Sequence, residues 1–429
     1  MSALPALLAI LALAWGVFAW FRPRRAVLLF PLFLPVYVLR AKYFGLPTTL
    51  LEMLWAATLL AALIRLKSAP WHLARERLKA WFPPLILWCS ASAIGVAIAP
   101  DQIAALGLWR AYFLEPVLFF ILLVGVLQDE TDRAWIIRCL ILDACLVAIW
   151  CVVQFLTGYG IPHPWDTASL LTRRATGPFP YPNAVSLFVA PIAALCAGLL
   201  VKSKVESRKS KVYDPIFHIP YSIFTSWLGF LSATLAALLA KSVGGFLGIL
   251  SATFLALMVR AKTRFYAVAA LILAVIVILA VPRIRAPVVS TLSFKHWSGK
   301  VRLIMWGETW NMLKDRPLFG AGLGAYPAVF KPYHQATFIE IFQYPHNIVL
   351  NLWSELGLLG IAAFIWLAVV WLKTARRAGL VFALPLVAIL VQGLVDVPYF
   401  KNDLAIMFWI FAALAISSSK QQVARIQKP

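Results

Sequence analysis

One histidine stands where a long polar segment meets the apolar run that follows it. His346 lies in the sequence Tyr344-Pro345-His346-Asn347, at the end of the polar segment 282–346. An imidazole has an ordinary pKa near 6.5, so it can accept a proton at neutral pH, and a positioned base contributes about 10²–10⁴ in rate. A single histidine at a membrane surface is more often a structural hydrogen-bonding group. His296 and His334 share the segment but adjoin no apolar run, which leaves His346 as the candidate base.

Basic side chains accompany this histidine in three polar segments. Arg173 and Arg174 precede a turn rich in proline and glycine, Lys241 stands beside the Gly244-Gly245 pair, and Arg302 lies in the polar segment itself. Guanidinium groups present a planar fork of donors that suits phosphate oxygens, and proline restricts the loop that holds them. We therefore expect Arg173 and Arg174 to form a diphosphate clamp, to which Lys241 would add a point charge. The alternative is contact with ordinary lipid headgroups.

The composition identifies the elements that must position these groups. Of the 429 residues 62% are hydrophobic and only 13% are charged. A bilayer core about 30 Å thick requires about 20 helical residues per crossing, and its backbone must be hydrogen-bonded internally. We predict an all-α polytopic membrane protein with about 12–13 transmembrane helices and one large loop, 282–346, that carries short helices. The apolar runs are 4–20, 26–39, 46–64, 83–99, 106–127, 134–156, 184–201, 219–240, 245–259, 265–281, 347–372, 379–395 and 404–417.

Lys and Arg residues predict the orientation of these helices. More than half of the 39 basic residues fall in alternate connectors, which the positive-inside rule assigns to the cytoplasm. The polar segments 157–183, 282–346 and 396–403 then share the outer face, where three loops can build one site. We predict N-terminal transmembrane helices at 1–156, a transmembrane region at 157–417 that contains the site, and a basic cytoplasmic tail at 418–429.

The net charge of +22 follows from this arrangement. The charges are spread through connectors rather than gathered on one face, so we expect membrane lipids and no nucleic acid as partners. The acidic residues and the five cysteines show no metal-ligand spacing, and we expect no metal and no cofactor. Gly320 to Gly324 has the look of a nucleotide loop but lacks a preceding soluble strand, so a flexible turn is expected. Arg110 and Glu115 lie five residues apart near one end of an apolar run; they either mark an ion path or, with at least equal weight, form a structural ion pair or extend to the membrane surface.

The order of these motifs resembles the O-antigen ligase family of bacterial inner-membrane glycosyltransferases, which includes the O-antigen polymerases. The resemblance covers roughly residues 170–405. It rests on Arg174 to Asn183, Ser242 to Gly245, Arg302 to Trp306, Asp315 to Gly324, His346-Asn347 before Glu355 to Gly360, and Asp396 to Phe400. The chain departs from many relatives at Val243, where they carry arginine after the serine. Relatives usually have about twelve spans, in which case one short run, first of all the one with Pro31 and Pro35, does not cross.

The resemblance implies an activity in lipopolysaccharide or other polysaccharide synthesis at the cell envelope. Such enzymes transfer a glycan from a polyprenyl diphosphate carrier to an acceptor hydroxyl at the periplasmic face, without a metal and with inversion. The acceptor is a lipid-anchored sugar or another glycan. Arg174 and Arg302 would hold the diphosphate and His346 would remove the acceptor proton, while Asn347, Glu355 and Asp396 would support them.

Other functions fit parts of the same sequence. A polymerase of the family differs from a ligase in its acceptor alone, and a member that attaches glycans to protein fits equally well. A multi-pass transporter would have intramembrane charges too, but it would be expected to show weak inverted repeats, and none is evident. A non-catalytic assembly component is the remaining alternative.

Overall fold

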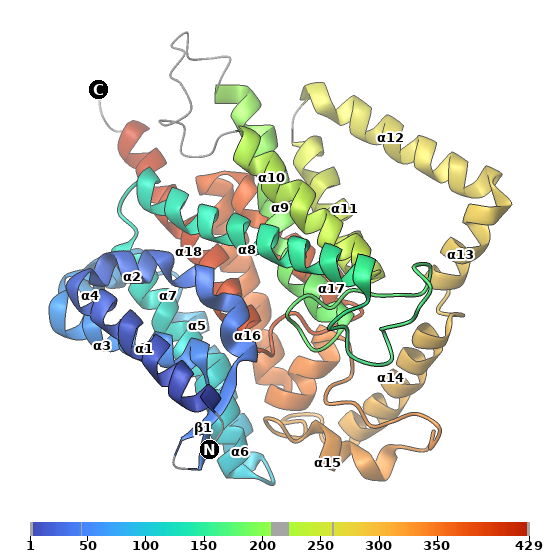
Figure 1. Ribbon diagram of the computed structural model, residues 1–429, viewed down its shortest axis with the longest axis horizontal. Coiled ribbons are helices and arrows are strands. Elements are labelled where there is room, and N and C mark those ends of the chain that lie inside the picture. Colours follow the sequence, from blue (N-terminus) through green and yellow to red (C-terminus); the bar gives the residue numbers. More distant parts are fainter. Residues whose placement is uncertain (1–2, 44, 207–222, 260, 427–429) are drawn as a thin grey trace.

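The computed structural model describes residues 3–43, 45–206, 223–259 and 261–426. Within these residues the chain is a bundle of helices with a single two-stranded hairpin, which confirms the predicted all-α polytopic fold (Figure 1). Helices α14 (Trp297–Asp315) and α15 (Tyr326–Phe330) and the hairpin lie at one end of the bundle, and the last turns of α18 (Asn402–Ile426) lie at the other. The predicted basic tail at 418–429 falls partly outside the described residues.

The N-terminal elements run along the bundle and return. Helix α1 (Ala3–Phe21) is followed by α2 (Pro23–Leu29), the 3-10 helix η1 (Phe30–Val38), strands β1 (Arg40–Tyr43) and β2 (Leu46–Thr49), and α3 (Leu50–Arg65). The Tyr43 hydroxyl donates to the Pro5 carbonyl at 2.5 Å, so the hairpin lies beside the start of α1. At rises of about 1.5 Å and 2.0 Å per residue, α2 and η1 together extend roughly 28 Å, close to the thickness of a bilayer core. The short run with Pro31 and Pro35 is therefore long enough to return across the bundle.

The hairpin corrects one prediction. Residues 46–49 were expected to begin a helix, yet they pair with β1 in antiparallel register, with Arg40 opposite Thr49. Helix α3 begins only at Leu50, where Thr49 and Glu52 form a capping box. A threonine three residues before a glutamate is a sequence signal for a helix start, so this boundary was readable from the sequence.

Three helices pack around α9. Helix α9 (Pro182–Glu206) is almost completely buried over its apolar part and packs against α10 (Ile223–Leu239), α11 (Val243–Met258) and α17 (Leu384–Gly393). The other helices of the bundle are α4 (Ala69–Arg77), α5 (Phe82–Ile98), α6 (Gln102–Trp109), the π-helical η2 (Arg110–Leu114), α7 (Glu115–Val126), α8 (Glu130–Thr157), α12 (Ala261–Ala280), α16 (Ile348–Ala378), the 3-10 helix η4 (Leu380–Ala383) and α18 (Asn402–Ile426).

Six helices among the described residues are long and apolar enough to cross a membrane alone. The bent pair α4 and α5 would make a seventh, and four further apolar helices are shorter. The chain is thus a multi-pass membrane protein, and the count of 12–13 spans stays a prediction. The expected pair of Arg110 and Glu115 is present at 3.6 Å, and Glu52 adds a second carboxylate at 3.1 Å from Arg110.

The polar segment 282–346 forms the outer helices. It contains α13 (Pro282–Leu292), α14 (Trp297–Asp315), α15 (Tyr326–Phe330) and the 3-10 helix η3 (Lys331–Tyr333). Short helices were expected in this segment, and the structure contains them. A small core that includes Met305, Met312, Tyr326 and Phe330 joins α14 to α15.

The glycine-rich segment from Gly320 to Gly324 is tightly packed, not flexible as expected. Helix α16 breaks at Gly357, where φ is +67° and ψ is −167°. The break frees the Ser354 carbonyl, which accepts the N–H groups of Ala321 at 2.7 Å and Gly322 at 3.2 Å. A Cβ at Gly320 would lie 2.1 Å from the Trp353 carbonyl oxygen, so only glycine allows this approach. The segment thereby fixes the part of α16 that follows His346.

Candidate functional site

A cavity of about 770 Å³ opens beside α14, at the end of the bundle where α14 and α15 lie. Its walls come from segments far apart in the sequence, including the 157–183 loop, α14, the start of α16 and the 396–403 connector. The lining includes His346, Arg174 and Arg302 together with Arg40, Glu355 and Lys401. The three outer segments predicted to build one site are therefore adjacent to a single cavity.

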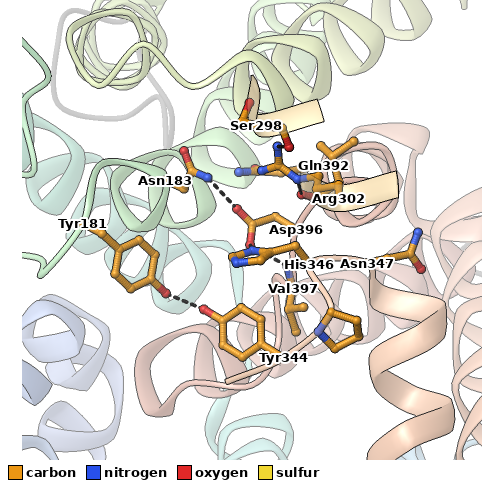
Figure 2. Close-up of polar contacts among 12 residues, drawn as sticks. Tyr181, Asn183, Ser298, Arg302, Tyr344, His346, Asn347, Gln392, Asp396 and Val397 are labelled. Carbon is orange, nitrogen blue, oxygen red and sulfur yellow. Dashed lines mark hydrogen bonds and ion pairs between the residues drawn. The ribbon is translucent and has the colours of Figure 1, made fainter. Parts of the chain in front are cut away.

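His346 lies beside a buried carboxylate (Figure 2). Its Nδ1 is 3.2 Å from Oδ1 of Asp396, which is 3% exposed. The other carboxylate oxygen accepts from the Asn183 amide at 3.1 Å, and Oδ1 also accepts the Val397 N–H at 2.9 Å. A carboxylate requires a proton on Nδ1, so the neutral imidazole presents the lone pair of Nε2. Among the described residues Nε2 has no hydrogen-bond partner, and this is the atom left to act on a ligand.

The electrostatic balance keeps Asp396 ionised. Burial alone would raise the pKa of the Asp396 carboxyl, but hydrogen bonds from His346 and the Val397 N–H, with the charge on Arg302, hold that pKa below its ordinary value. An ionised Asp396 stabilises the imidazolium that forms when His346 takes a proton. The pair is thus arranged for proton abstraction.

Aromatic contacts fix the histidine ring. The rings of Tyr344 and Phe342 pack edge-on against it, with centroids 5.0 Å and 5.3 Å away. The Trp306 indole of α14 donates to the Pro345 carbonyl at 2.7 Å. His346 itself has a left-handed backbone, with φ of +48°, a conformation uncommon outside glycine. Such a conformation is seen most often at functional sites.

Arg302 and Arg174 leave part of each guanidinium available. Nε of Arg302 donates to the Val395 carbonyl at 3.0 Å and Nη1 to the Ser298 carbonyl at 3.3 Å. Nε of Arg174 donates to the Ala240 carbonyl at 3.0 Å and Nη2 to the Asn183 amide oxygen at 3.0 Å. Nη2 of Arg302 and Nη1 of Arg174 have no protein partner in the described part of the chain. Both side chains line the cavity, so each can offer these donors to an anion.

The charges of these arginines favour an anionic ligand. Burial lowers the pKa of Arg174, and the nearby positive charge of Arg302 lowers it further. Burial also lowers the pKa of Arg302, although Asp396 raises it. An anion between the two groups would relieve their repulsion.

Arg173 and Lys241 do not reach the cavity, in contrast to the predicted clamp. The Arg173 guanidinium is bound by backbone carbonyls of Phe155, Leu156, Thr167 and Ala168, which anchor the loop to the end of α8. The Lys241 ammonium donates to the carbonyls of Leu170 and Leu171 at 2.8 Å and 2.7 Å. Both cations hold the loop that presents Arg174. Arg173 anchors the loop, whereas its neighbour Arg174 lines the cavity. The sequence could not separate these two roles, because it does not show which side of the loop faces the cavity.

The supporting residues divide in the same way. Asn347 caps α16 by accepting the N–H groups of Val349 and Leu350, and its amide donates to the Leu394 carbonyl at 3.0 Å. Glu355 lies on the wall of the cavity and accepts the Gly324 N–H, with no hydrogen bond to His346. Asp396 alone of these three contacts the histidine.

Lys401 is a site residue that sequence reasoning missed. Its ammonium is buried, has no hydrogen-bond partner among the residues that the structure describes, and lies over the rings of Tyr37, Phe179 and Tyr181, at 4.8 Å, 5.3 Å and 5.4 Å. Burial lowers the pKa of Lys401, while Asp403 and Asp396 raise it. Its sequence position next to Asp396-Val397-Pro398 was the available signal.

Comparison with protein families matches residues 228–365, about a third of the chain, to the family described as O-antigen ligase. The matched region contains Arg302, His346 and Glu355, and it confirms the family resemblance seen in the sequence. No curated protein matches the chain.

Proposed function

Residues 228–365 belong to the O-antigen ligase family, and from this premise we propose that the chain is a membrane glycosyltransferase of bacterial cell-surface polysaccharide synthesis. The proposed donor is a glycan linked to a polyprenyl diphosphate, and the acceptor is a sugar hydroxyl. The reaction takes place at the outer face of the plasma membrane, the periplasmic face of an inner membrane, and inverts the anomeric centre.

His346 is the proposed catalytic base. Nε2 takes the proton of the acceptor hydroxyl while that oxygen attacks the anomeric carbon of the donor sugar. The bond from this carbon to the diphosphate oxygen breaks, and its electron pair leaves with the diphosphate. Asp396 stabilises the imidazolium during this step and is itself a positioning residue.

Arg302 and Arg174 are the proposed diphosphate ligands. The leaving group gains negative charge as the glycosidic bond breaks, and the free guanidinium donors stabilise that charge more in the transition state than in the bound donor. Arg173 and Lys241 fix the same loop through hydrogen bonds to backbone carbonyl oxygens, on the side away from the cavity. The clamp proposed here therefore has two arginines rather than four basic groups.

One observation carries the proposal. Nδ1 of His346 is held by a buried carboxylate, and within the described part of the chain its Nε2 has no partner; two arginines whose remaining guanidinium donors no described residue accepts line the same cavity. Glycosyl transfer from a diphosphate requires a base and anion-binding groups at one site. A transport site would not need a base in a fixed tautomer.

The test is transfer by the purified protein in proteoliposomes, with an undecaprenyl-diphosphate-linked oligosaccharide as donor. A lipid-anchored oligosaccharide and a second carrier-linked oligosaccharide serve as alternative acceptors, which separates ligase from polymerase activity. We expect product with the wild type and none with His346→Ala or Arg302→Ala. His296→Ala is the matched control, because His296 is exposed in the same outer segment and caps α14 without a side-chain bond. A wild type that gives no product with either acceptor would overturn the proposal and favour transport or an assembly role.

A further inference from the structure

A second polar group on the cavity wall has no task in the mechanism above. Asn351 is 1% exposed and lines the cavity. Among the described residues neither its amide nitrogen nor its amide oxygen has a hydrogen-bond partner. Leaving a buried amide unpaired costs about 1–3 kcal/mol, so native structures seldom do it without a reason. A ligand that supplies both a donor and an acceptor would remove this cost.

Asn351 shares one face of α16 with Glu355. The two residues are four apart, the spacing that places side chains on the same side of a helix. The Asn351 N–H donates to the Asn347 carbonyl, and Asn347 is the N-cap of α16. At about 3.6 residues per turn, Asn351 lies about one turn and Glu355 about two turns beyond Asn347 along the helix axis.

The Glu355 carboxylate is held in place with capacity to spare. One oxygen accepts the Gly324 N–H, and the glycine segment that supplies this donor is fixed by the broken turn of α16. No other hydrogen bond to the carboxylate is present in the described part of the chain. The amide of Asn351 can donate two hydrogen bonds, and the oxygens of both side chains can accept several, a set that matches neighbouring hydroxyl groups of a sugar.

The α16 wall and the arginines suit different ligands. Figure 2 shows the Arg302 guanidinium on the Asp396 side of His346, and α16 starting at Asn347. Neither Asn351 nor Glu355 can carry a positive charge, so the α16 wall does not attract an anion as the arginines do. In an inverting transfer the acceptor oxygen and the leaving diphosphate lie on opposite sides of the anomeric carbon, which requires separate places for the two.

We propose that Asn351 and Glu355 form the acceptor subsite, where they hydrogen-bond hydroxyl groups of an uncharged sugar ring and hold the reacting hydroxyl towards Nε2 of His346. This inference rests on the proposed glycosyl transfer. Asn351 is in these terms a specificity-determining residue for the acceptor, and it has no part in holding the diphosphate.

The experiment measures the two substrates separately, in the same proteoliposomes, for the wild type and Asn351→Leu. Leucine has a similar volume and no polar atom. We expect the KM for the acceptor oligosaccharide to rise about tenfold, the loss that follows from removing a neutral hydrogen bond, with an unchanged KM for the donor. The unfolding temperature should stay the same or increase, because the substitution removes an amide that has no hydrogen-bond partner among the described residues.

Ser354→Ala is the matched control. Ser354 is also buried on α16 with an unpaired hydroxyl, but it does not line the cavity. Its removal should leave both KM values unchanged. A further comparison uses an acceptor that lacks the hydroxyl next to the reacting one. The wild type should bind this acceptor about tenfold more weakly than the complete acceptor. Asn351→Leu should bind the two acceptors with nearly equal affinity.

The outcomes separate the two proposals. A wild type without product rejects the proposed function. An active wild type with an unchanged acceptor KM in Asn351→Leu, or with a raised donor KM instead, rejects the acceptor subsite while leaving glycosyl transfer in place.

Discussion

At the scale of single residues, the tautomer of His346 decides whether it can act as a base. Asp396→Asn keeps the size of the side chain but replaces an acceptor of the Nδ1 proton with an amide that can donate to Nδ1. The imidazole would then carry its proton on Nε2, where it cannot accept another. We expect kcat to fall by about 10²–10⁴, with the donor KM changed little. Thermal unfolding in detergent checks that the variant is folded, and a kcat within twofold of the wild type would show that Asp396 has no role in catalysis.

Two arginines with different surroundings, Arg302 and Arg173, give a second prediction at this scale. Arg302→Lys removes the free Nη donor at the cavity, so the donor KM should rise about tenfold while the unfolding temperature changes little. Arg173→Lys removes several bonds to buried carbonyls and should destabilise the protein by about 1–3 kcal/mol, with the donor KM of the folded protein unchanged. Transfer kinetics and melting curves of the two variants check both halves. The reverse pattern would place Arg173, not Arg302, at the diphosphate.

At the scale of elements, the break in α16 fixes the cavity wall that follows His346. A Cβ at Gly357 would lie 2.2 Å from the Leu318 carbonyl oxygen, and its positive φ is strained for any other residue. Gly357→Ala should therefore destabilise the protein by at least about 2 kcal/mol. Gly307→Ala is the control, since it lies inside α14 with no atom within 4 Å of the added Cβ, and it should stabilise by about 0.5–1 kcal/mol. Melting temperatures in detergent check the pair, and equal shifts would mean that the broken turn can relax.

The outer helices contain an ion pair whose contribution depends on pH. Nδ1 of His334 lies 3.0 Å from Oε2 of Glu308, and the other Glu308 oxygen accepts two backbone N–H groups at 335 and 336. The hydrogen bond to Glu308 raises the pKa of His334 above 6.5. Burial alone would raise the pKa of Glu308, but His334 and the two N–H groups hold it below 4.5.

The sign of the pH dependence follows from these two shifts. The stabilisation from His334 is complete below pH 6.5 and is lost as pH rises through its raised pKa. The stabilisation from Glu308 is complete above pH 4.5 and is lost as pH falls through its lowered pKa. Amide hydrogen exchange at 331–341 should be slowest, relative to His334→Gln, between about pH 4.5 and 6.5. A difference between wild type and His334→Gln that does not vary with pH would contradict the ion pair.

At the scale of the whole molecule, the sequence was sufficient for what depends on local pattern. Apolar runs predicted the helices, and the types and order of His346, Arg302 and Arg174 predicted which groups share the cavity. The pairing of His346 with Asp396 crosses 50 residues and depends on how α17 returns, which no local pattern encodes. The roles of Arg173 and Asn351 could not be predicted for the same reason. The sequence shows the residue type, but it does not show which way each side chain faces from its loop or helix.

The distribution of charge gives the last prediction, which concerns the orientation of the entire chain. Positive-inside reasoning places the cavity outside and the basic connector between α3 and α5 inside. Lys331 lies in the outer segment and Lys79 in that connector, and both are exposed. The five native cysteines all lie in helices of the bundle. They are first replaced by alanine or serine, so that any labelling comes from the new cysteine. In intact cells or spheroplasts a membrane-impermeant maleimide should label Lys331→Cys and leave Lys79→Cys unreacted until the membrane is permeabilised. Labelling of Lys79→Cys alone would show that the cavity faces the cytoplasm. Carrier-linked glycans destined for the surface have not yet crossed the membrane on that side, so the same base and arginines would require a different donor.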